Sequence, residues 1–276
     1  MSTRISFQFK RGGKVSSLTR LLASNVTFKK KVMSQTWYRG QSEHKKLVPK
    51  IGRLHEHGGK YLENFKGTQE QNLLHRFRRR AYAFEGRILN DWEALFLGRH
   101  YGLPTRLLDW TANPLVALYF ACCDSLDKRG CVWGIARVVE EENDLDMLKL
   151  ANEGEDPFDL YSVTEKGRKP VNKTQDAVKI LHPFYNSPRI VAQGGIFTFH
   201  SNPWVDLKSY VGKSFYRNRL DISHLIEWEI PARAKPKIIQ QLDNLGVNRR
   251  TAYPDLEGLA RGLWETEVLW KGKRKK

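Results

Sequence analysis

The spacing of hydrophobic residues along this chain follows two different periods, which predict helices in some segments and strands in others. Helical spacing occurs at residues 15–26, 68–84, 90–102 and 233–245. Strand-like patterns occur at residues 35–41, 131–139, 188–200, 224–231 and 265–270. A glycine pair interrupts 188–200, so this stretch is expected to hold one strand or two. Because strands and helices do not alternate regularly, the pattern indicates an α+β fold, a single domain with mixed or antiparallel central strands and flanking helices.

The most apolar segment of the chain directly follows a group of polar residues. Asn113 and Pro114 predict the start of a helix, with asparagine as the N-cap and proline in the first turn. Residues 115–123 are apolar on every side, so this helix is expected at the centre of the fold. Polar side chains at the mouth of a buried helix must pair with one another or bind a ligand. The residues concerned are His100, Thr105, Arg106, Asp109, Trp110 and Thr111.

Two interpretations of these residues stay open at the level of sequence. Arg106 and Asp109 lie three residues apart, and they either pair with each other before the helix or serve a ligand. His100 at a helix end is either a structural residue or a functional one. Trp110 is either a core aromatic or a ring that stacks on a ligand.

The chain divides into three parts by composition. Residues 1–34 form a basic N-terminal segment with helical character, residues 35–270 form the main domain, and residues 271–276 are a basic tail. An acidic and polar insertion at 140–180 interrupts the main domain. Within it, residues 140–159 hold nine acidic residues and one basic residue.

Charge points to a polyanionic partner. The net charge of the 276-residue chain is +17, and because residues 140–159 contribute −8, the remaining residues carry +25. Such a surface attracts polyanions, of which nucleic acid is the first candidate. The alternative is a solvated basic surface without a specific partner.

Several other classes of protein are not expected. No apolar run reaches about eighteen residues and charge interrupts the N-terminal segment, so we expect a cytoplasmic protein without a membrane partner. Neither a Walker A motif nor a GxGxxG loop occurs. The triplet His55-Glu56-His57 lacks the HExxH spacing of a zinc site, so no metal is expected.

Four motifs together resemble the FRG-domain family, which is named for an aromatic-Arg-Gly motif. They read "WYRG" at 37–40, "HYGLPTRLLDWTANPLVALYFA" at 100–121, "PRIVAQGGIF" at 188–197 and "YPDLEGLARGL" at 253–263. One departure is Arg99, since similar sequences have glutamine before the histidine. The family name does not fix a reaction.

A weaker, partial resemblance links the chain to ADP-ribosyltransferases of the Arg-Ser-Glu type. Many of these enzymes have an aromatic-Arg strand, then a Ser/Thr-ending strand that leads into an Ala/Phe-rich helix, and then a Glu-containing strand. "WYRG" and "LLDWTANPLVALYFA" are similar to the first two parts. The resemblance implies an ADP-ribosyltransferase-like fold and NAD as the substrate. The implied catalytic residues are Arg39 and Thr111 with Gln193, Glu229 or Glu267 as the third, among which the sequence does not decide.

The chemistry of these side chains is compatible with that resemblance. The planar fork of Arg39 suits a pyrophosphate, and Gly40 would let a ligand approach the backbone. Arg39 could instead pair with a carboxylate in the core. Thr111 could orient that arginine or bind the nicotinamide amide, and a carboxylate would stabilise the oxocarbenium-like ribose. The expected NAD-binding residues are Tyr38, Arg39, Gly40, His100, Thr105, Arg106, Asp109 and Trp110.

The resemblance therefore leads to a functional hypothesis. It implies an NAD-dependent ADP-ribosyltransferase that modifies nucleic acid, with RNA favoured. Such an enzyme would act as a toxin or phage-defence effector, and an inhibitor or antitoxin protein would be a partner. One alternative is a non-catalytic nucleic-acid-binding or sensor domain. Another is an NAD glycohydrolase without a macromolecular acceptor.

Overall fold

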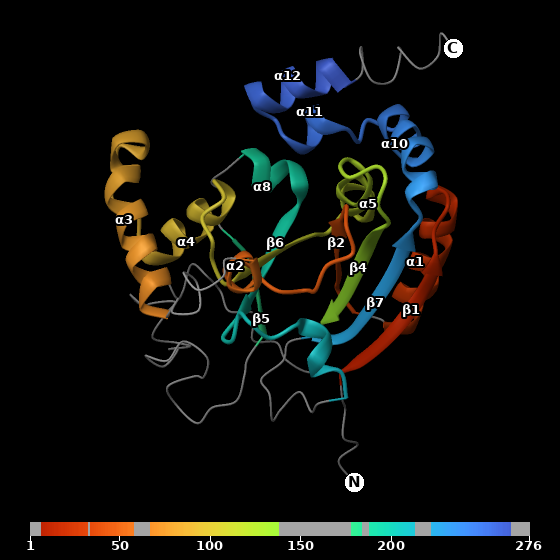
Figure 1. Ribbon diagram of the computed structural model, residues 1–276, viewed down its shortest axis with the longest axis horizontal. Helices are drawn as coiled ribbons and strands as arrows, with labels where there is room; N and C mark the ends of the chain where they lie inside the picture. Colours follow the sequence, from red (N-terminus) through yellow and green to blue (C-terminus); the bar gives the residue numbers. More distant parts are fainter. Residues whose placement is uncertain are drawn as a thin grey trace.

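A mixed β-sheet runs through the part of the chain that the computed structural model describes, which is residues 7–32, 34–57, 67–137, 178–183, 188–212 and 222–265 (Figure 1). Within these residues the sheet has seven strands in the order β1-β7-β4-β2-β3-β6-β5. The first pair, β1 and β7, is parallel, and the other neighbours are antiparallel. The strands are β1 (Gln8–Lys14), β2 (Thr36–Gln41), β3 (Leu107–Thr111), β4 (Gly130–Arg137), β5 (Val178–Leu181), β6 (Gly195–His200) and β7 (Ile222–Ile230).

Helices flank this sheet on its outer sides, with α3 at one edge of the molecule and α1 at the other (Figure 1). The helices are α1 (Leu18–Val32), α2 (Lys50–His57), α3 (Gly67–Glu85), α4 (Asp91–His100), α5 (Pro114–Cys122), α8 (Pro188–Gln193), α10 (Lys235–Asn244), α11 (Arg249–Ala252) and α12 (Leu256–Trp264). Two 3-10 helices, η2 (Leu207–Tyr210) and η3 (Ala232–Ala234), complete the described elements. The predicted α+β class is confirmed.

The sheet consists of two halves that meet at one point. The strands β2 and β3 pair through a single residue pair, Tyr38 with Thr111. On one side of this joint lie β1, β7, β4 and β2, and on the other lie β3, β6 and β5. A core cluster that includes Trp37, Trp133 and Trp110 takes residues from both halves, so the two halves share this core.

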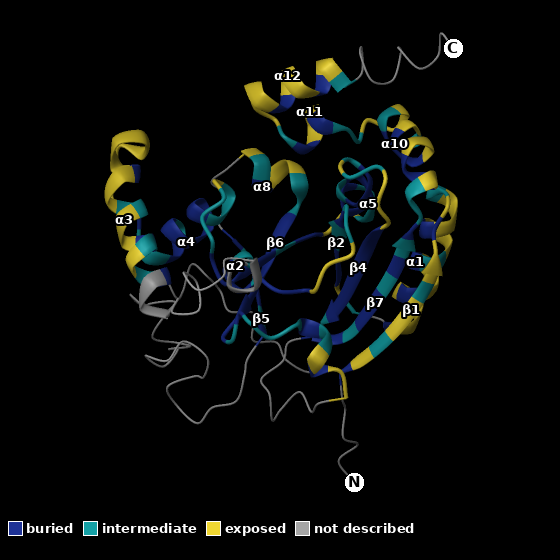
Figure 2. Cartoon of the chain, in the orientation of Figure 1, coloured by how far each residue is buried: buried dark blue, intermediate teal, exposed yellow. Residues whose placement is uncertain are grey.

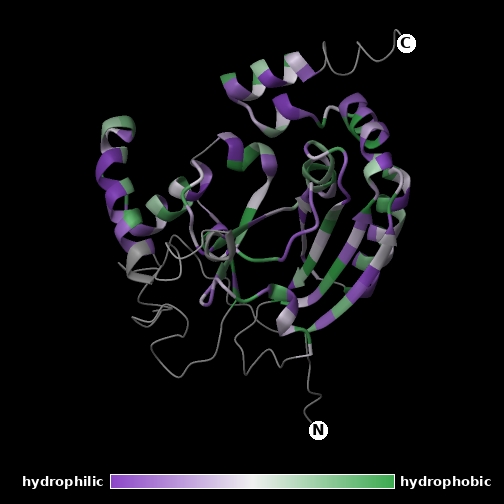
Figure 3. Cartoon of the chain, in the orientation of Figure 1, coloured by the Kyte–Doolittle hydropathy of each residue, from purple (hydrophilic) through white to green (hydrophobic). Residues whose placement is uncertain are grey.

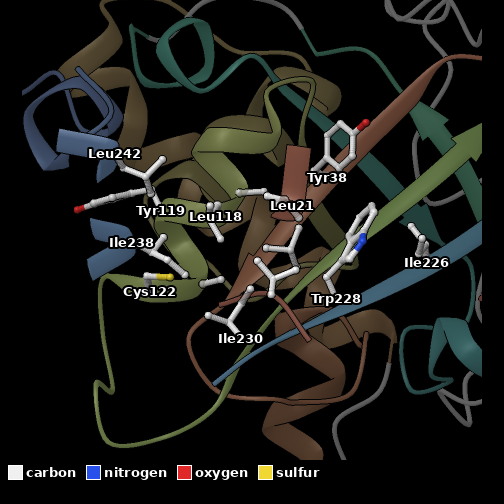
Figure 4. Close-up of a cluster of buried hydrophobic side chains, with 14 of the residues drawn as sticks. Leu21, Tyr38, Leu118, Tyr119, Cys122, Ile226, Trp228, Ile230, Ile238 and Leu242 are labelled. Atoms are coloured by element: carbon white, nitrogen blue, oxygen red, sulfur yellow. The ribbon is translucent and has the colours of Figure 1, made fainter. Parts of the chain in front are cut away.

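A second core lies between the first half-sheet and the helices α1, α5 and α10 (Figure 4). The strands are mostly buried and β4 is strongly hydrophobic, whereas the edge strand β1 is largely exposed (Figures 2 and 3). A third core joins α3 and α4 to β3, β5 and β6. Each half of the sheet therefore has its own helical cover.

The central helix α5 was predicted correctly. The side chain of Asn113 accepts a hydrogen bond from the backbone N–H of Leu115, and Pro114 is in the first turn. Helix α5 lies so close to β2 that a Cβ on Gly40 would overlap the carbonyl oxygen of Ala117. The absence of a side chain at Gly40 thus allows α5 to pack closely against β2.

Several sequence expectations differ from the structure or lie outside the residues that it describes. Residues 188–193 form helix α8 and not a strand, because Pro188 opens the helix and Gly194, at a φ of +54°, ends it. The strand β1 was not predicted. The acidic insertion, apart from its last residues, and the basic tail lie outside the described residues, as does all but the first residue of the strand expected at 265–270. Among the helices that are described, none is both long and apolar enough to cross a membrane.

Candidate functional site

A pocket opens where the two halves of the sheet separate. Its volume is about 300 Å³, and its walls come from β2, β3 and β6, the end of α4, helices α5 and α8, and the residue that follows α11. The lining residues are Tyr38, Arg39, Gly40, Arg99, His100, Gly102, Asp109, Trp110, Thr111, Phe120, Arg189, Ile190, Gln193, Gly195, Ile196, Phe197 and Tyr253.

An Arg–Asp–Arg group occupies one wall of this pocket. Arg39 Nη1 donates to the backbone carbonyl of Asp109 at 2.8 Å and to its Oδ2 at 3.3 Å. Arg99 approaches the same carboxylate with two nitrogens, Nε to Oδ1 at 3.0 Å and Nη2 to Oδ2. The Asp109 side chain is 40% exposed, so this ion-paired carboxylate still faces the pocket.

The ionisation of Asp109 is fixed by these neighbours. Burial raises the pKa of the carboxyl, but Arg99 and Arg39 outweigh burial and lower the pKa to about 2. Burial lowers the pKa of Arg39 to about 10, although Asp109 opposes this, so Arg39 also stays charged at neutral pH. Two arginines thus surround one carboxylate, and the group carries a net positive charge.

The lining of the pocket also includes a third arginine next to aromatic rings. The guanidinium of Arg189 lies 4.1 Å from the ring centre of Tyr253, and Phe120 contacts that ring edge-on at 5.8 Å. Arg189 has no ion pair with a carboxylate among the described residues. Burial, with a further contribution from Arg189, lowers the pKa of His100, which favours the neutral form of this histidine. The pocket is therefore basic and lined with aromatic rings, which suits an anion that carries a planar ring.

Most of the residues expected at the site line this pocket, but several side chains are engaged elsewhere. The hydroxyl of Tyr38 donates to Asn25 at 2.6 Å inside the core. The indole of Trp110 donates to Thr198 at 2.9 Å. Thr111 donates to the carbonyl of Gln193 and forms no hydrogen bond with Arg39, so its hydroxyl does not orient that arginine.

The amide of Gln193 has a structural partner as well. Its Nε2 donates to the carbonyl of Ala252 at 2.9 Å, which ties α8 to α11. Gly40 lines the pocket, but the space beside it is filled by α5. The helix backbone therefore explains why residue 40 has no side chain, and the expectation that Gly40 lets a ligand approach the backbone stays a prediction.

The remaining expected residues are not brought to the pocket. Thr105 is buried and Glu229 lies at a separate, charged pocket, where it pairs with Arg129 at 3.6 Å. Glu267 lies outside the described residues. None of the three candidates for the third catalytic position thus places a carboxylate in the part of this pocket that the structure describes.

The proposed pair between Arg106 and Asp109 is wrong. Arg106 is 1% exposed and pairs with Glu70, which is 2% exposed, at 2.7 Å. Glu70 also accepts the backbone N–H of Arg106 at 2.9 Å. Arg106 directly precedes β3. Side chains alternate between the two faces of an extended chain, so the side chains of residues three apart, Arg106 and Asp109, point to opposite faces. Arg106 therefore fixes α3 to the start of β3 and does not reach the pocket.

Comparison with known proteins identifies a family model that matches part of the chain. Residues 34–130 match the family model of the FRG domain. This chain carries an FRG domain. No curated protein and no solved structure matches the chain. The matched segment of the FRG domain contains β2, α4, β3 and α5, and so includes the Arg39–Asp109–Arg99 group.

The aromatic-Arg-Gly motif of the FRG domain is explained by three different environments on one strand. Tyr38 belongs to the core cluster that includes residues of α5 (Figure 4). Arg39 lines the pocket, and Gly40 admits the helix backbone. Each residue type is required by its own contact. The motif therefore joins the core, the site and the helix packing within three residues.

Nine of the lining residues were not singled out as site residues from the sequence, among them the charged and aromatic residues Arg99, Phe120, Arg189 and Tyr253. Arg99 was noted from the sequence only because similar sequences have glutamine at this position. A signal for it existed, because it directly precedes His100 in the motif. Arg189 and Tyr253 lie in the later motifs at 188–197 and 253–263, but their convergence on β2 depends on the fold.

Proposed function

We propose that the pocket binds a nucleotide through its phosphates and that the protein transfers ADP-ribose from NAD to nucleic acid. One observation carries the proposal: the guanidinium groups of Arg39, Arg99 and Arg189 converge on a pocket in which Asp109 is the sole carboxylate among the described lining residues. Guanidinium forks match the geometry of phosphate oxygens. The aromatic rings of Phe120 and Tyr253 offer an edge or face for a base.

The pocket also offers groups suited to the transfer. When the nicotinamide–ribose bond breaks, nicotinamide leaves with the bonding electron pair and the ribose becomes positively charged. The Asp109 carboxylate is ionised and partly exposed, so it can stabilise that charge. The acceptor then forms a bond to the ribose and loses a proton, which neutral His100 can take up.

A second candidate function has its own support. Asp109 is already paired with two arginines, which reduces the negative field that it presents to a ligand. A pocket of this kind also suits a non-catalytic domain that only senses a nucleotide. Nicotinamide release distinguishes the candidates: a binding domain releases none, a hydrolase releases it without labelling a polymer, and a transferase does both.

The test compares Asp109→Asn with the parent protein in NAD binding and in NAD turnover. Because the substitution removes a negative charge next to two arginines, we expect unchanged or tighter NAD binding. Nicotinamide release should fall by about a hundredfold, which corresponds to about 2.7 kcal/mol of transition-state stabilisation. Parent-level turnover in the folded variant would exclude Asp109 from the reaction. NAD binding without turnover in the parent would establish the sensor function.

The lysine variant of Arg39 tests the binding part of the proposal. Arg39→Lys keeps the charge and loses the planar fork, and a charge-assisted hydrogen bond is worth about 1.5 to 3 kcal/mol. We expect NAD affinity to fall by about ten- to a hundredfold in a folded protein. Arg129→Lys is the matched control because Arg129 is exposed at another pocket. Equal affinity of the two variants would remove Arg39 from the phosphate site.

The nucleic-acid target is tested separately by salt. The chain carries +17, and a contact with several phosphates releases counterions, so RNA affinity should fall about a thousandfold or more between 50 and 200 mM salt. Fluorescence anisotropy with a labelled RNA oligomer measures this. A flat salt response would mean that nucleic acid is not the acceptor, while leaving the NAD pocket in place.

A further inference from the structure

An apolar groove, separate from the pocket that contains Arg39 (here called the anion pocket), is formed in part by the end of α4. Its volume is about 530 Å³, and it is bounded by α3 and by α4 with the turn that follows. Phe77, Ala81 and Phe84 of α3 and Leu97, Tyr101 and Leu103 of the second wall line it. Phe84 is 89% exposed and Tyr101 is 72% exposed. Large apolar side chains with this exposure mark an interaction surface.

The shape of the groove matches a helix. The four apolar residues of α3 that line the groove are Leu73, Phe77, Ala81 and Phe84, at steps of four, four and three, so they form a stripe about 16 Å long on one helix face. The facing wall also comes from a helix and its C-terminal turn. Two such walls accept the apolar face of a third helix.

The rim of the groove is basic. Arg76 and Arg80 line it together with one acidic residue, Glu85. Neither arginine forms an ion pair with a carboxylate in the described ranges. They are therefore available to carboxylates that flank the apolar face of a bound helix.

We propose that this groove binds an amphipathic helix of an acidic partner protein. The apolar face of the partner helix covers Phe84 and Tyr101, and its acidic residues face Arg76 and Arg80. A second copy of the chain is a poorer occupant, because each copy carries +17 and two copies repel each other. The proposal is independent of NAD chemistry, since no lining residue of the groove lines the anion pocket.

The test uses a set of synthetic 18-residue helical peptides with leucine and phenylalanine on one face and glutamate along both flanks. Matched peptides carry lysine at every glutamate position. Fluorescence anisotropy is measured with the whole 276-residue chain. We expect the glutamate peptides to bind at least tenfold more tightly than the lysine peptides. Phe84→Ser should weaken the glutamate peptides at least tenfold, and Arg80→Glu at least fivefold.

The matched control is Ile88→Ser. Ile88 is also apolar and is 75% exposed, but it does not line the groove, so peptide affinity should change less than twofold. Since Phe84 and Ile88 are both surface residues, both variants should keep the parent melting temperature. Equal losses in the two variants would indicate non-specific stickiness and overturn the proposal.

Other occupants give different results. Failure of all glutamate peptides to bind overturns the proposal. Sedimentation that shows a dimer of the parent and a monomer of Phe84→Ser would assign the groove to a second copy. Loss of RNA affinity in Arg80→Glu together with no peptide binding would assign the arginines to nucleic acid.

Discussion

Asp109 holds together two arginines that come from different elements. Arg39 belongs to β2 and Arg99 to α4, and both of their side chains are only 12% exposed. Without the carboxylate, these two cations would remain next to each other with little water. One residue thus contributes to the stability of the domain and to the charge of its pocket.

We expect Asp109→Asn to lower stability more than Thr111→Val does. Removing one partner of a fully buried ion pair costs about 3 to 5 kcal/mol, and the exposure of Asp109 reduces this to about 1 to 3 kcal/mol. The Thr111 hydroxyl forms neutral hydrogen bonds worth about 1 kcal/mol. Thermal melts of both variants measure the difference, and a smaller loss for Asp109→Asn would show that water replaces the carboxylate.

The stabilisation by Asp109 has a predictable pH dependence. Its folded-state pKa is depressed to about 2, so its contribution is present above the unfolded pKa of about 4 and is lost as pH falls toward 2. The difference in melting temperature between the parent and Asp109→Asn should be constant from pH 5 to 8 and should shrink below pH 4. A difference that grows on acidification would contradict the pairing.

Lys235 is a second residue with a strong local role. It is fully buried, and its Nζ donates to three backbone carbonyls, those of Ser42 at 2.7 Å, Asp124 at 3.1 Å and Ser125 at 2.8 Å. Lys235→Met keeps the side-chain length but leaves these carbonyls without a donor, so we expect a loss of about 2 to 4 kcal/mol. Chemical denaturation measures it. Lys237→Met on the exposed side of α10 is the control and should change stability by less than about 0.5 kcal/mol.

At the scale of elements, the contact between β2 and α5 is the tightest constraint around the site. A side chain at Gly40 would overlap the backbone of α5 at Ala117, and backbone cannot move aside as a side chain can. We expect Gly40→Ala to cost about 3 kcal/mol or more, at the upper end of overpacking effects. Gly195→Ala on β6 is the control, since its Cβ would meet Ile190 at an ordinary 3.5 Å. Similar unfolding free energies for the two variants would show that α5 shifts freely.

The elements that the sequence predicts correctly are those with local signals. Asn90 caps α4 through a capping box with Glu93, and Asn113 with Pro114 starts α5. Helix α8 was mistaken for a strand because its apolar residues outweighed its proline and glycine boundaries. The strand β1 lacks alternation, because it is an edge strand rich in charge and glycine.

The site was predictable only in part, for a related reason. Arg39 and Asp109 lie in the sequence motifs at 37–40 and 100–121, so both were predicted as site residues. The partner of Arg106 is Glu70, 36 residues away on α3, and no local spacing reveals such a pairing. Arg189 and Tyr253 reach the pocket only because α8 leads into β6 and is tied to α11 by the hydrogen bond from Gln193 to Ala252. Long-range convergence is set by packing, which a single sequence does not display.

At the scale of the whole molecule, the two half-sheets have separate helical covers and share the cluster that contains Trp37, Trp110 and Trp133. We expect amide hydrogen exchange to separate the described chain into two cooperative groups. One should contain β4 and β7, and the other β3 and β6, because only one ladder pair joins them. Uniform protection across all four strands would show that the shared cluster couples the halves fully.

Because Tyr38 and Thr111 form the single pair between β2 and β3, a molecule bound across this joint would change how the two half-sheets unfold. Arg39 belongs to one half, whereas Asp109 and Arg189 belong to the strand and helix of the other. A molecule bound by both Arg39 and Arg189 would connect the two half-sheets, which are otherwise joined by a single ladder pair between β2 and β3. ADP-ribose should therefore slow amide exchange most along β2 and β3, and should make the two halves unfold as one.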